Sequence, residues 1–253
     1  MFRVVIPARY ASVRLPGKML LPIAGKPMLQ WVYERARASG AAEVLIATDD
    51  HLIVSAAHVF GAEALMTSPT HASGSDRIAE VAQRRGWCAS DIVVNVQGDE
   101  PLLPPSLIDQ VAALLEAHAA AQIATLATPV ESLAELLDPN AVKVVTDVGG
   151  RALYFSRAPI PWSREGAPSG FASQSAFTGA RRHIGMYAYR VAALQRLAAL
   201  PPGTLERCER LEQLRALENG FDIRVATAVE RPGPDVNTIA DLERVLDTLG
   251  GRP

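Results

Sequence analysis

The chain begins MFRVVIPARYASVRLPGK, residues 1–18. Within it, residues 4–6 form a short apolar run of valine and isoleucine, and β-branched residues in such a run favour a buried strand. The run stops at a proline, and residues 7–18 then read PARYASVRLPGK, in which two prolines and a glycine favour an irregular loop. A buried strand that opens into a cationic loop is thus the first unit of the fold.

The same strand pattern returns three times in the first half of the chain. Short apolar runs stand at 44–47, 62–66 and 92–96, and longer stretches with helical spacing of apolar residues separate them. Nearly continuous apolar strands joined by helices predict a mostly parallel, doubly wound, Rossmann-like α/β sheet with both faces covered. Ligands of such sheets bind beyond the carboxyl ends of the strands, so polar residues that follow strands are candidates for a site.

Two of the connecting helices have recognisable starts. Pro27 stands where a first helical turn accepts proline. The segment 73–76, Ser-Gly-Ser-Asp, predicts a capped start for a helix over 77–85.

The second half of the chain is less regular. It predicts a strand, turn and strand over 142–157, a strand over 183–190, helices near 191–199 and 204–218, a strand at 222–228 and a final helix from about 239. No repeat and no long linker interrupts this order. We therefore expect a single domain over residues 1–253, with a smaller α+β lobe inserted at approximately 130–215.

Composition excludes several classes of function. The 253 residues are 49% apolar, enough for a full-sized core, and the formal net charge is -2. Such a chain offers no electrostatic surface for nucleic acid or for an anionic membrane. Cys88 and Cys208 show no CxxC spacing, and no segment reads as a signal peptide or a transmembrane helix. These features predict a cytoplasmic protein. Composition does not exclude a small anionic ligand that is bound by a few cationic side chains.

The loop after the first strand carries three cations, Arg9, Arg14 and Lys18, a number that suits a triphosphate. The loop is not a Walker A motif, because its glycine spacing is too long and Lys26 is followed by Pro27, and no GxGxxG follows the strand. Scattered charges on a solvated loop are the alternative. The prolines and the glycine directly after a buried strand favour the phosphate site.

Residues 93–103, VVNVQGDEPLL, place unusual polar residues after another buried strand. Asp99 stands at the strand's carboxyl edge, where a carboxylate can bind a hard metal ion, and the glycine before it permits close approach of a nucleotide. Asp99 could instead cap the helix that starts near 104, and Gln97 could satisfy a loop amide. The position favours a metal ligand for Asp99, whereas the role of Glu100 stays open.

These segments and others stand in an order that points to a family. PARYASVRLPGK, GKPM, ATDD, SGSDR, VNVQGDEP, PNAVKVV, ALYFSR with PIPW, RHIGMYAYR and LEQLR follow one another along nearly the whole chain. Single motifs of this set are unspecific, but the ordered set resembles the 3-deoxy-manno-octulosonate cytidylyltransferases, or CMP-Kdo synthetases. The RLPGK loop is shared with the CMP-sialic acid synthetases, whereas LYFSR, HIGMYAYR and LEQLR resemble the Kdo branch.

The resemblance implies an enzyme with a nucleotide-diphospho-sugar transferase type of fold. Such an enzyme transfers CMP from CTP to the anomeric hydroxyl of Kdo, giving CMP-Kdo and pyrophosphate for lipopolysaccharide synthesis. The resemblance also implies magnesium (Mg²⁺) as cofactor, a homodimer, and a sugar-binding and dimerisation role for the lobe at approximately 130–215. The stretch 164–180 matches the family poorly, so its role stays open.

The resemblance assigns the site residues as well. The catalytic residues would be Arg9, Lys18, Asp99 and Asp235, the two aspartates as magnesium ligands. Nucleotide contacts would come from Ala8, Arg9, Arg14, Lys18, Ser73, Gly74, Ser75, Arg77, Gln97 and Asp99. Sugar contacts would come from Gln97, Arg157, His183, Tyr187, Glu212 and Gln213. Departures from the family pattern are mild: Ser75 replaces a usual Thr, Asp76 a common Glu, and Met19 a usual Pro.

The residues by themselves leave several of these roles open. His183 alternates with Gly185, Tyr187 and Tyr189 on one strand face, which fits a packed cluster about as well as a ligand site. The guanidinium of Arg157 suits a sugar carboxylate, but an arginine more often forms a surface ion pair.

Other roles depend on the resemblance alone. Glu212 and Gln213 fit a solvated helix face, and Asp235 fits an ordinary turn after a Pro-Gly-Pro segment. Two other functions stay open: a cytidylyltransferase for sialic acid or another acidic sugar, and a non-catalytic module that binds nucleotide sugars. The presence of both proposed metal carboxylates argues against the non-catalytic module.

Overall fold

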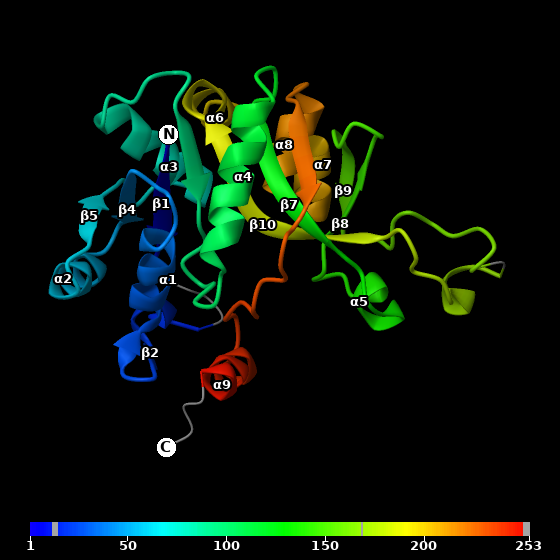
Figure 1. Ribbon diagram of the computed structural model, residues 1–253, viewed down its shortest axis with the longest axis horizontal. Helices are drawn as coiled ribbons and strands as arrows, with labels where there is room; N and C mark the ends of the chain where they lie inside the picture. Colours follow the sequence, from blue (N-terminus) through cyan, green and yellow to red (C-terminus); the bar gives the residue numbers. More distant parts are fainter. Residues whose placement is uncertain (12–14, 168, 250–253) are drawn as a thin grey trace.

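The computed structural model describes residues 1–11, 15–167 and 169–249. A twisted sheet with helices on both sides forms its centre, and an extended segment projects from one end (Figure 1). The strands of the main sheet are β1 (Phe2–Ala8), β4 (Glu43–Thr48), β5 (Glu63–Met66), β6 (Ile92–Asn95), β7 (Ile123–Pro129), β8 (Lys143–Thr146), β9 (Ala152–Ser156), β10 (Arg181–Arg190) and β11 (Ile223–Thr227). Two short strands, β2 (Pro22–Ile23) and β3 (Lys26–Pro27), pair separately.

The helices alternate with the strands through most of the chain. They are α1 (Met28–Arg37), α2 (His51–Val59), α3 (Gly74–Arg84), α4 (Pro105–Ala117), α5 (Leu133–Leu137), α6 (Val191–Ala198), α7 (Thr204–Glu209), α8 (Glu212–Glu218) and α9 (Ile239–Thr248), with single 3₁₀ turns at Lys18–Leu20 and Phe171–Ser173. In the described part of the chain, none of them combines the length and the apolar character that crossing a bilayer requires.

The main sheet is mostly parallel. Its central strand order is β11-β7-β10-β6-β1-β4-β5, and β8 and β9 attach beyond the start of β10. Parallel pairs join β1 to β4 and β6, β4 to β5, and β7 to β11, whereas β10 runs antiparallel to both of its neighbours, β6 and β7. The expected mostly parallel, doubly wound α/β sheet is confirmed.

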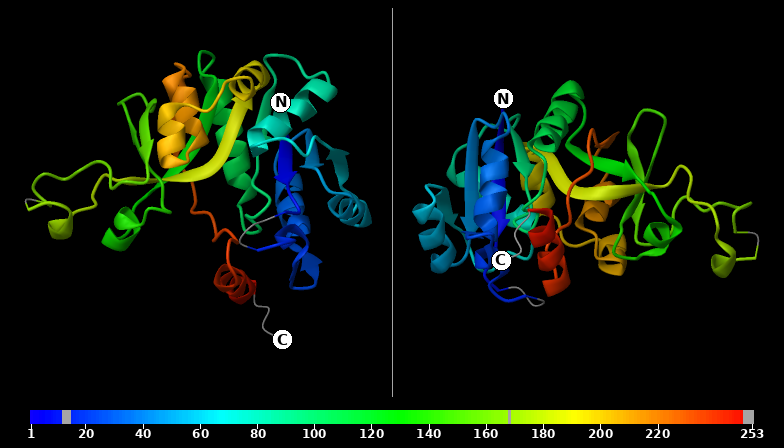
Figure 2. Two further views of the ribbon diagram at one scale, coloured as in Figure 1. Left: turned by 180° about the vertical axis from the view of Figure 1, so that it is seen from behind. Right: turned by 60° about the horizontal axis from the view of Figure 1, so that its bottom comes forward.

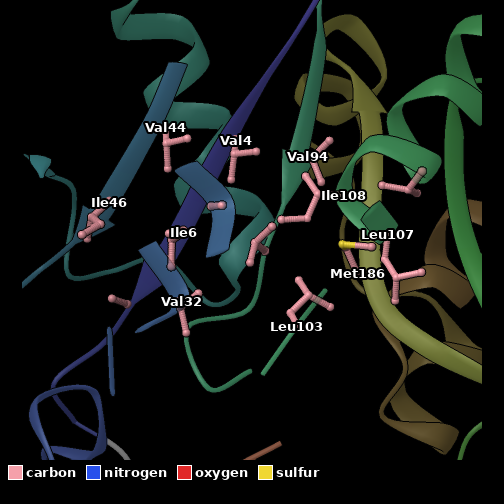
Figure 3. Close-up of a cluster of buried hydrophobic side chains, with 14 of the residues drawn as sticks. Val4, Ile6, Val32, Val44, Ile46, Val94, Leu103, Leu107, Ile108 and Met186 are labelled. Atoms are coloured by element: carbon pink, nitrogen blue, oxygen red, sulfur yellow. The ribbon is translucent and has the colours of Figure 1, made fainter. Parts of the chain in front are cut away.

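Each face of the sheet buries its own apolar layer. Val4 and Ile6 of β1 point to one face, where α1 and α4 supply Val32 and Leu107 (Figure 3). Val5, between them in the sequence, points to the other face, which α3, α6 and α8 cover. Neighbouring strand residues alternate between faces, so a run of consecutive apolar residues fits a strand buried on both sides. Burial of one such aliphatic side chain contributes about 1.5–3 kcal/mol.

The strand register brings several loops to one edge of the sheet. The parallel strands β1, β4 and β6 end at Ala8, Thr48 and Asn95, and their following loops leave from the same side. Because β10 is antiparallel, its first residues lie at that edge too, with His183 paired to Ala127 of β7. The loops after β1 and β6 and the start of β10 therefore converge, as the rule for ligand sites in such sheets requires.

Three helix boundaries differ from the sequence-based expectation. Helix α3 begins at Gly74, three residues before the predicted start, because Ser73 is its N-cap and forms a capping box with Asp76. The segment 204–218 is not one helix: Arg210 adopts a left-handed conformation with φ 54° and separates α7 from α8. Pro27 lies at the N-cap of α1 rather than inside its first turn.

The predicted lobe at approximately 130–215 stays a prediction. Its strand β10 lies inside the main sheet between β6 and β7, and α6 and α8 pack on the main core. The part that extends away from this core is the segment between β9 and β10, as both views in Figure 2 show. The β8–β9 hairpin at its base contributes Val144 and Phe155 to the core. A smaller apolar cluster of Val130, Leu136 and Ala180 lies under the base of this extension.

Candidate active site

Two cavities open at the carboxyl edge of the sheet. The main cavity, about 480 Å³, is lined by Gln97, Asp99, Glu100, Thr128, Asn140, Val142, Arg157, Arg182, His183, Ile184, Gly185, Arg231, Pro232, Gly233, Asp235 and Asn237. The loop cavity, about 220 Å³, is lined by Pro7, Arg9, Ala11, Lys18, Met19, Gly74, Gln97, Gly98 and Asp99. Because Gln97 and Asp99 line both, a ligand in one cavity can meet a ligand in the other at these two side chains.

The loop cavity gathers residues from three segments of the chain. Arg9 follows β1 and donates from Nη2 to the carbonyl oxygen of His71 at 2.9 Å, which ties the first loop to the segment before α3. Gly74, the first residue of α3, packs against Pro7. Arg14, the remaining predicted phosphate ligand of the first loop, lies outside the described residues.

Gly98 lies at a tight contact between two loops. A Cβ atom at this position would lie 2.8 Å from Met19 Sδ and 3.2 Å from the carbonyl oxygen of Pro7. The glycine therefore lets the loop after β6 lie directly against the loop after β1. The sequence predicted close approach to a nucleotide here, and the structure adds close approach to the neighbouring backbone.

Lys18 and Asp99 form a largely enclosed ion pair. Lys18 Nζ lies 2.5 Å from Asp99 Oδ2, and the two side chains are 10% and 23% exposed. Lys18 directly follows Gly17, whose φ of 68° begins the 3₁₀ turn that directs this side chain inward. The structure therefore gives Lys18 a carboxylate partner across the cavity.

Asp99 does not cap the following helix. Helix α4 has Pro104 as its N-cap and Pro105 as its first residue, so the capping alternative for Asp99 is wrong. Instead the carbonyl oxygen of Asp99 accepts from the backbone amide of Val236 at 2.8 Å, which fastens the loop before α9 to the loop after β6. Asp235, next to Val236, lines the same main cavity as Asp99.

Glu100 adds a third carboxylate at this cavity. Its Oε2 atom is buried and has no hydrogen-bond partner among the described residues. Burial, with a smaller contribution from Asp99 and Asp235, raises the pKa of Glu100 to about 8. Arg182 lowers this pKa, but by less than burial raises it, so Glu100, whose role the sequence left open, favours its protonated form near neutral pH.

The main cavity holds three arginines, of which the sequence predicted Arg157 as a ligand. Arg157 donates from Nε to the carbonyl oxygen of Glu209 at 2.7 Å and from Nη1 to that of Pro139 at 2.9 Å. In the described part of the chain, no carboxylate forms an ion pair with its guanidinium, so the surface ion-pair alternative is wrong. Arg157 is oriented by carbonyl groups and keeps its positive charge for a ligand.

Arg182 and Arg231 share one carboxylate at the rim of the main cavity. Glu135 lies 3.4 Å from Arg182 Nη1 and 2.7 Å from Arg231 Nη2. Burial alone would raise the pKa of Glu135, but the amide of Glu131 and the Arg231 guanidinium outweigh it and hold this pKa below its usual range. With Arg157, these side chains make the cavity suited to an anion.

His183 is a neutral imidazole with an assigned tautomer. Burial lowers the pKa of His183 to about 3. Its Nε2 lies 3.0 Å from Thr125 Oγ1, and that hydroxyl faces the carbonyl oxygens of Ile184 and Met186 at 3.1 and 2.8 Å. Because Thr125 has one proton and gives it to a carbonyl, His183 Nε2 must donate to Oγ1. Nδ1 is then the acceptor nitrogen of the ring, suited to a ligand hydroxyl.

The remaining sugar-binding candidates lie in a buried polar cluster that lines neither cavity. Ser73 Oγ donates to Glu212 Oε1 at 3.1 Å, and Arg215 Nη2 lies 3.0 Å from the same oxygen. Ser75 hydrogen-bonds both Tyr189 and Glu212. Burial, more than any charged neighbour, raises the pKa of Glu212. The cluster joins the start of α3 to the start of α8, and the solvated-face alternative for Glu212 is wrong.

Tyr187 and Gln213 complete this region. The ring of Tyr187 lies between those of His183 and Tyr189, with centroids at 5.2 and 5.7 Å. Its hydroxyl is buried and meets no hydrogen-bond partner among the described residues. Gln213 is 8% exposed.

Three residues that were predicted to contact the nucleotide are also buried. Arg77 is fully buried, its Nη2 lies 2.7 Å from Asp49 Oδ2, and its Nη1 donates to the hydroxyl of Thr67. Ala8 and Ser75 are buried as well. The Arg77–Asp49 pair links α3 to the loop after β4, so in this structure Arg77 fixes the nucleotide-side loops relative to one another.

The sequence missed several residues of the main cavity: Thr128, Asn140, Arg182, Arg231 and Asn237. Arg182 and Asn140 stand within the motifs RHIGMYAYR and PNAVKVV, so the sequence could have indicated both residues as site candidates. Arg231 and Asn237 had no such signal, because they approach the cavity only through the path of the loop before α9.

The comparisons with known proteins agree with one another. The family profile described as "Cytidylyltransferase" matches residues 3–223. The chain is similar to proteins named 3-deoxy-manno-octulosonate cytidylyltransferase from Thioalkalivibrio sulfidiphilus, with 56% identity over 98% of each chain, and from Pseudomonas fluorescens, with 57% identity over 98% of each chain.

Solved structures extend this similarity to three dimensions. A CMP:2-keto-3-deoxy-manno-octonic acid synthetase complexed with CTP superposes with a TM-score of 0.87, 42% sequence identity and 98% coverage of both chains. A cytidylyltransferase from Leptospira borgpetersenii superposes with a TM-score of 0.60 at 18% identity, over 96% of this chain and 83% of that one. The second match, at this identity, supports the fold alone.

Proposed function

Because the chain belongs to the family of 3-deoxy-manno-octulosonate cytidylyltransferases, we propose that its two cavities bind the two substrates of that reaction and meet at Asp99. The enzyme transfers CMP from CTP to 3-deoxy-manno-octulosonate (Kdo). The product, CMP-Kdo, serves lipopolysaccharide synthesis. The observation that carries the proposal is the pair of cationic cavities that share Gln97 and Asp99.

The reaction requires positioning and charge neutralisation more than a protein nucleophile. The oxygen of the anomeric hydroxyl forms a bond to the α-phosphorus of CTP, the bond from that phosphorus to the bridging oxygen breaks, and pyrophosphate leaves with the electron pair. The hydroxyl proton passes to solvent. Nucleotidyl transfer of this kind is accelerated mainly by cations held near the phosphates in a site that excludes water.

The loop cavity is the proposed triphosphate site. Arg9 and Lys18 supply its cations, and Arg14 of the same loop, outside the described residues, is proposed as a third. Gly74 lies at the N-terminus of α3, where backbone amides favour an anion. Gln97 lies between the two cavities and can contact both substrates. Ala8, Ser73, Ser75 and Arg77 support these contacts from behind the cavity, through the buried links described above.

The main cavity is the proposed Kdo site. The guanidinium of Arg157, oriented by two carbonyl groups and in no ion pair with a carboxylate of the described residues, is proposed to bind the sugar carboxylate. His183, with Nδ1 as an acceptor, and the unpartnered hydroxyl of Tyr187 suit sugar hydroxyls. Glu212 and Gln213 are proposed to act next to Tyr187, where they hold the polar cluster between α3 and α8.

The donor set at Asp99 fits magnesium. Mg²⁺ is usually held by one or two carboxylates together with substrate phosphates and water. Among the described residues, no three His, Cys, Asp or Glu side chains are grouped to hold a metal ion, which agrees with a site completed by the nucleotide. Asp99 and Asp235 are the proposed carboxylates, and Lys18 already places a positive charge 2.5 Å from Asp99. When bound, magnesium would neutralise charge on the phosphates.

The substrate proposal predicts a narrow specificity. Pyrophosphate release with Kdo and magnesium should be highest with CTP, and UTP, ATP and GTP should be at least about tenfold poorer, since a missed contact to the base costs about 1–3 kcal/mol. With CTP fixed, Kdo should be preferred over sialic acid. A coupled pyrophosphate assay across this panel measures both preferences.

Each alternative function has its own outcome in this panel. Preference for sialic acid would indicate the other branch of acidic-sugar cytidylyltransferases. Tight CTP binding without pyrophosphate release would indicate a non-catalytic module. Equal turnover of all four nucleotides would contradict the predicted preference for CTP.

We also propose that the enzyme works in the cytoplasm as a homodimer. Both cysteines, Cys88 and Cys208, are exposed and free, which suits a reducing compartment. The projecting segment between β9 and β10 carries Trp162, 45% exposed, and the β8–β9 hairpin carries Leu153, 60% exposed, so a second copy can cover apolar side chains there.

Light scattering should give about twice the chain mass of 27.1 kDa. Trp162→Ser and Leu153→Ser should shift the mass towards the monomer. A monomeric wild-type enzyme would contradict the dimer without affecting the proposed chemistry.

A further inference from the structure

The ammonium group of Lys18 lies within a small group of oxygens beside Asp99. Asp99 Oδ2 lies 2.5 Å from Lys18 Nζ, the carbonyl oxygen of Val236 lies 3.3 Å away, and Asn237 Oδ1 lies 3.5 Å away. Three oxygens from two loops thus face one positive charge. Side-chain and backbone oxygens in this arrangement are also the donors that a hard divalent cation takes.

The orientation of the Asn237 amide is fixed by Asp235. Asn237 Nδ2 donates to Asp235 Oδ2. Because a carboxylate can only accept, the amide nitrogen must face Asp235 and the amide oxygen must face Lys18. The backbone amide of Asn237 also donates to Asp241 Oδ2 at 2.9 Å, which holds the residue at the start of α9.

Burial distinguishes the two side chains. Asp235 is exposed, whereas Asn237 is half-buried beside Lys18. The segment between them is fastened to Asp99 by the hydrogen bond from the amide of Val236 to the carbonyl oxygen of Asp99, 2.8 Å long. The loop therefore presents the oxygen of Asn237, rather than the carboxylate of Asp235, to the point where Asp99 meets a cation.

We propose that Asn237 Oδ1 is the direct partner of Asp99 in holding the magnesium ion, and that Asp235 acts as a positioning residue that orients the Asn237 amide and adds negative charge behind it. This assignment rests on the proposed magnesium role at Asp99. Within this loop, we therefore expect metal affinity to depend more on the amide of Asn237 than on the carboxylate of Asp235. The loss of a group that orients a metal ligand typically lowers metal affinity by about 10- to 100-fold, so a conservative variant that keeps an acceptor oxygen is needed to separate the two roles.

The experiment measures Mn²⁺ binding to the full-length enzyme without nucleotide, from the loss of the free-ion signal in electron paramagnetic resonance. Asn237→Leu should raise the dissociation constant at least about tenfold. Asp235→Asn keeps an oxygen that accepts from the Asn237 amide, so it should raise the constant clearly less than Asn237→Leu does. Asn237→Asp keeps the oxygen and adds a charge, so it should bind Mn²⁺ at least as tightly as wild type.

Asp109→Asn is the matched control, because Asp109 contacts Gly40 at the opposite end of the sheet, and it should leave Mn²⁺ binding unchanged. Circular dichroism checks that Asn237→Leu is folded. If it is not, the Mn²⁺ affinity of Asn237→Asp tests the assignment instead. The assignment would be overturned if Asp235→Asn weakened Mn²⁺ binding as much as Asn237→Leu. It would also be overturned if Asn237→Asp bound Mn²⁺ more weakly than wild type. Wild-type enzyme that binds no Mn²⁺ would count instead against the magnesium proposal itself.

Discussion

Asp99→Asn should reduce kcat/KM by about 10²- to 10³-fold, the loss expected when one preorganised charge contact to the transition state is removed. Asp99 is, with Gln97, one of the two side chains that line both cavities, so its loss should affect the nucleotide and the acceptor together. The substitution keeps the shape of the side chain and one carbonyl oxygen. It removes the negative charge that pairs with Lys18 and that magnesium is proposed to need.

The fold should survive Asp99→Asn. The carbonyl oxygen of Asp99, which accepts from Val236, belongs to the backbone and is unchanged. Far-ultraviolet circular dichroism and the thermal midpoint should therefore stay close to wild type, and Asp109→Asn should keep full activity as the matched control. A variant with most of its activity at saturating magnesium would disprove the role of Asp99.

The sequence predicted the sheet because its strands are buried on both faces. In a run such as Val4 to Ile6, every residue is apolar because both faces of the sheet are buried. The residues that follow the run are polar because they lie at the open edge of the sheet. The same pattern indicated Arg9, Lys18 and Asp99 as candidate ligands, since each follows a strand or lies in the loop after one. Such a prediction depends only on local pattern and on the geometry of parallel sheets.

The break between α7 and α8 could not be read from local pattern. The segment around Arg210 has no glycine or proline, and its residues favour a helix. The helix ends because Glu209 is drawn into a distant contact: its carboxylate accepts from Ser156 Oγ at 2.6 Å and from the amide of Arg157 at 2.8 Å. A tertiary interaction therefore overrides helix propensity, and the same interaction orients Arg157 for its proposed ligand.

Arg77 and Asn237 show why site residues are harder to predict than strands. Arg77 is a cation close to the nucleotide loops in sequence, yet it is fully buried against Asp49. Asn237 is an ordinary turn residue in sequence, yet its oxygen faces Lys18 from 219 residues away. The direction of a side chain depends on contacts between segments far apart in the chain, and neither composition nor spacing contains that information.

Lys18→Met should lower kcat/KM by more than about a hundredfold, because it removes a cation proposed to bind the phosphates. Lys18→Arg should also lose activity, since the side chain is only 10% exposed and its cavity is shaped around a compact ammonium group. Lys26→Met is the matched control. Lys26 pairs with Glu34 at the surface, with side chains 39% and 41% exposed, so its loss should cost less than about 1 kcal/mol of stability and no activity.

The same variant should strengthen metal binding in the absence of nucleotide. Lys18 Nζ lies 2.5 Å from Asp99 Oδ2, so the ammonium group would compete with a divalent cation that binds the same carboxylate. Lys18→Met should therefore bind Mn²⁺ several-fold more tightly by electron paramagnetic resonance while turnover falls. Opposite changes in metal affinity and activity would place Lys18 at Asp99 in the free enzyme and at the phosphates during turnover. A parallel loss of both would contradict this exchange.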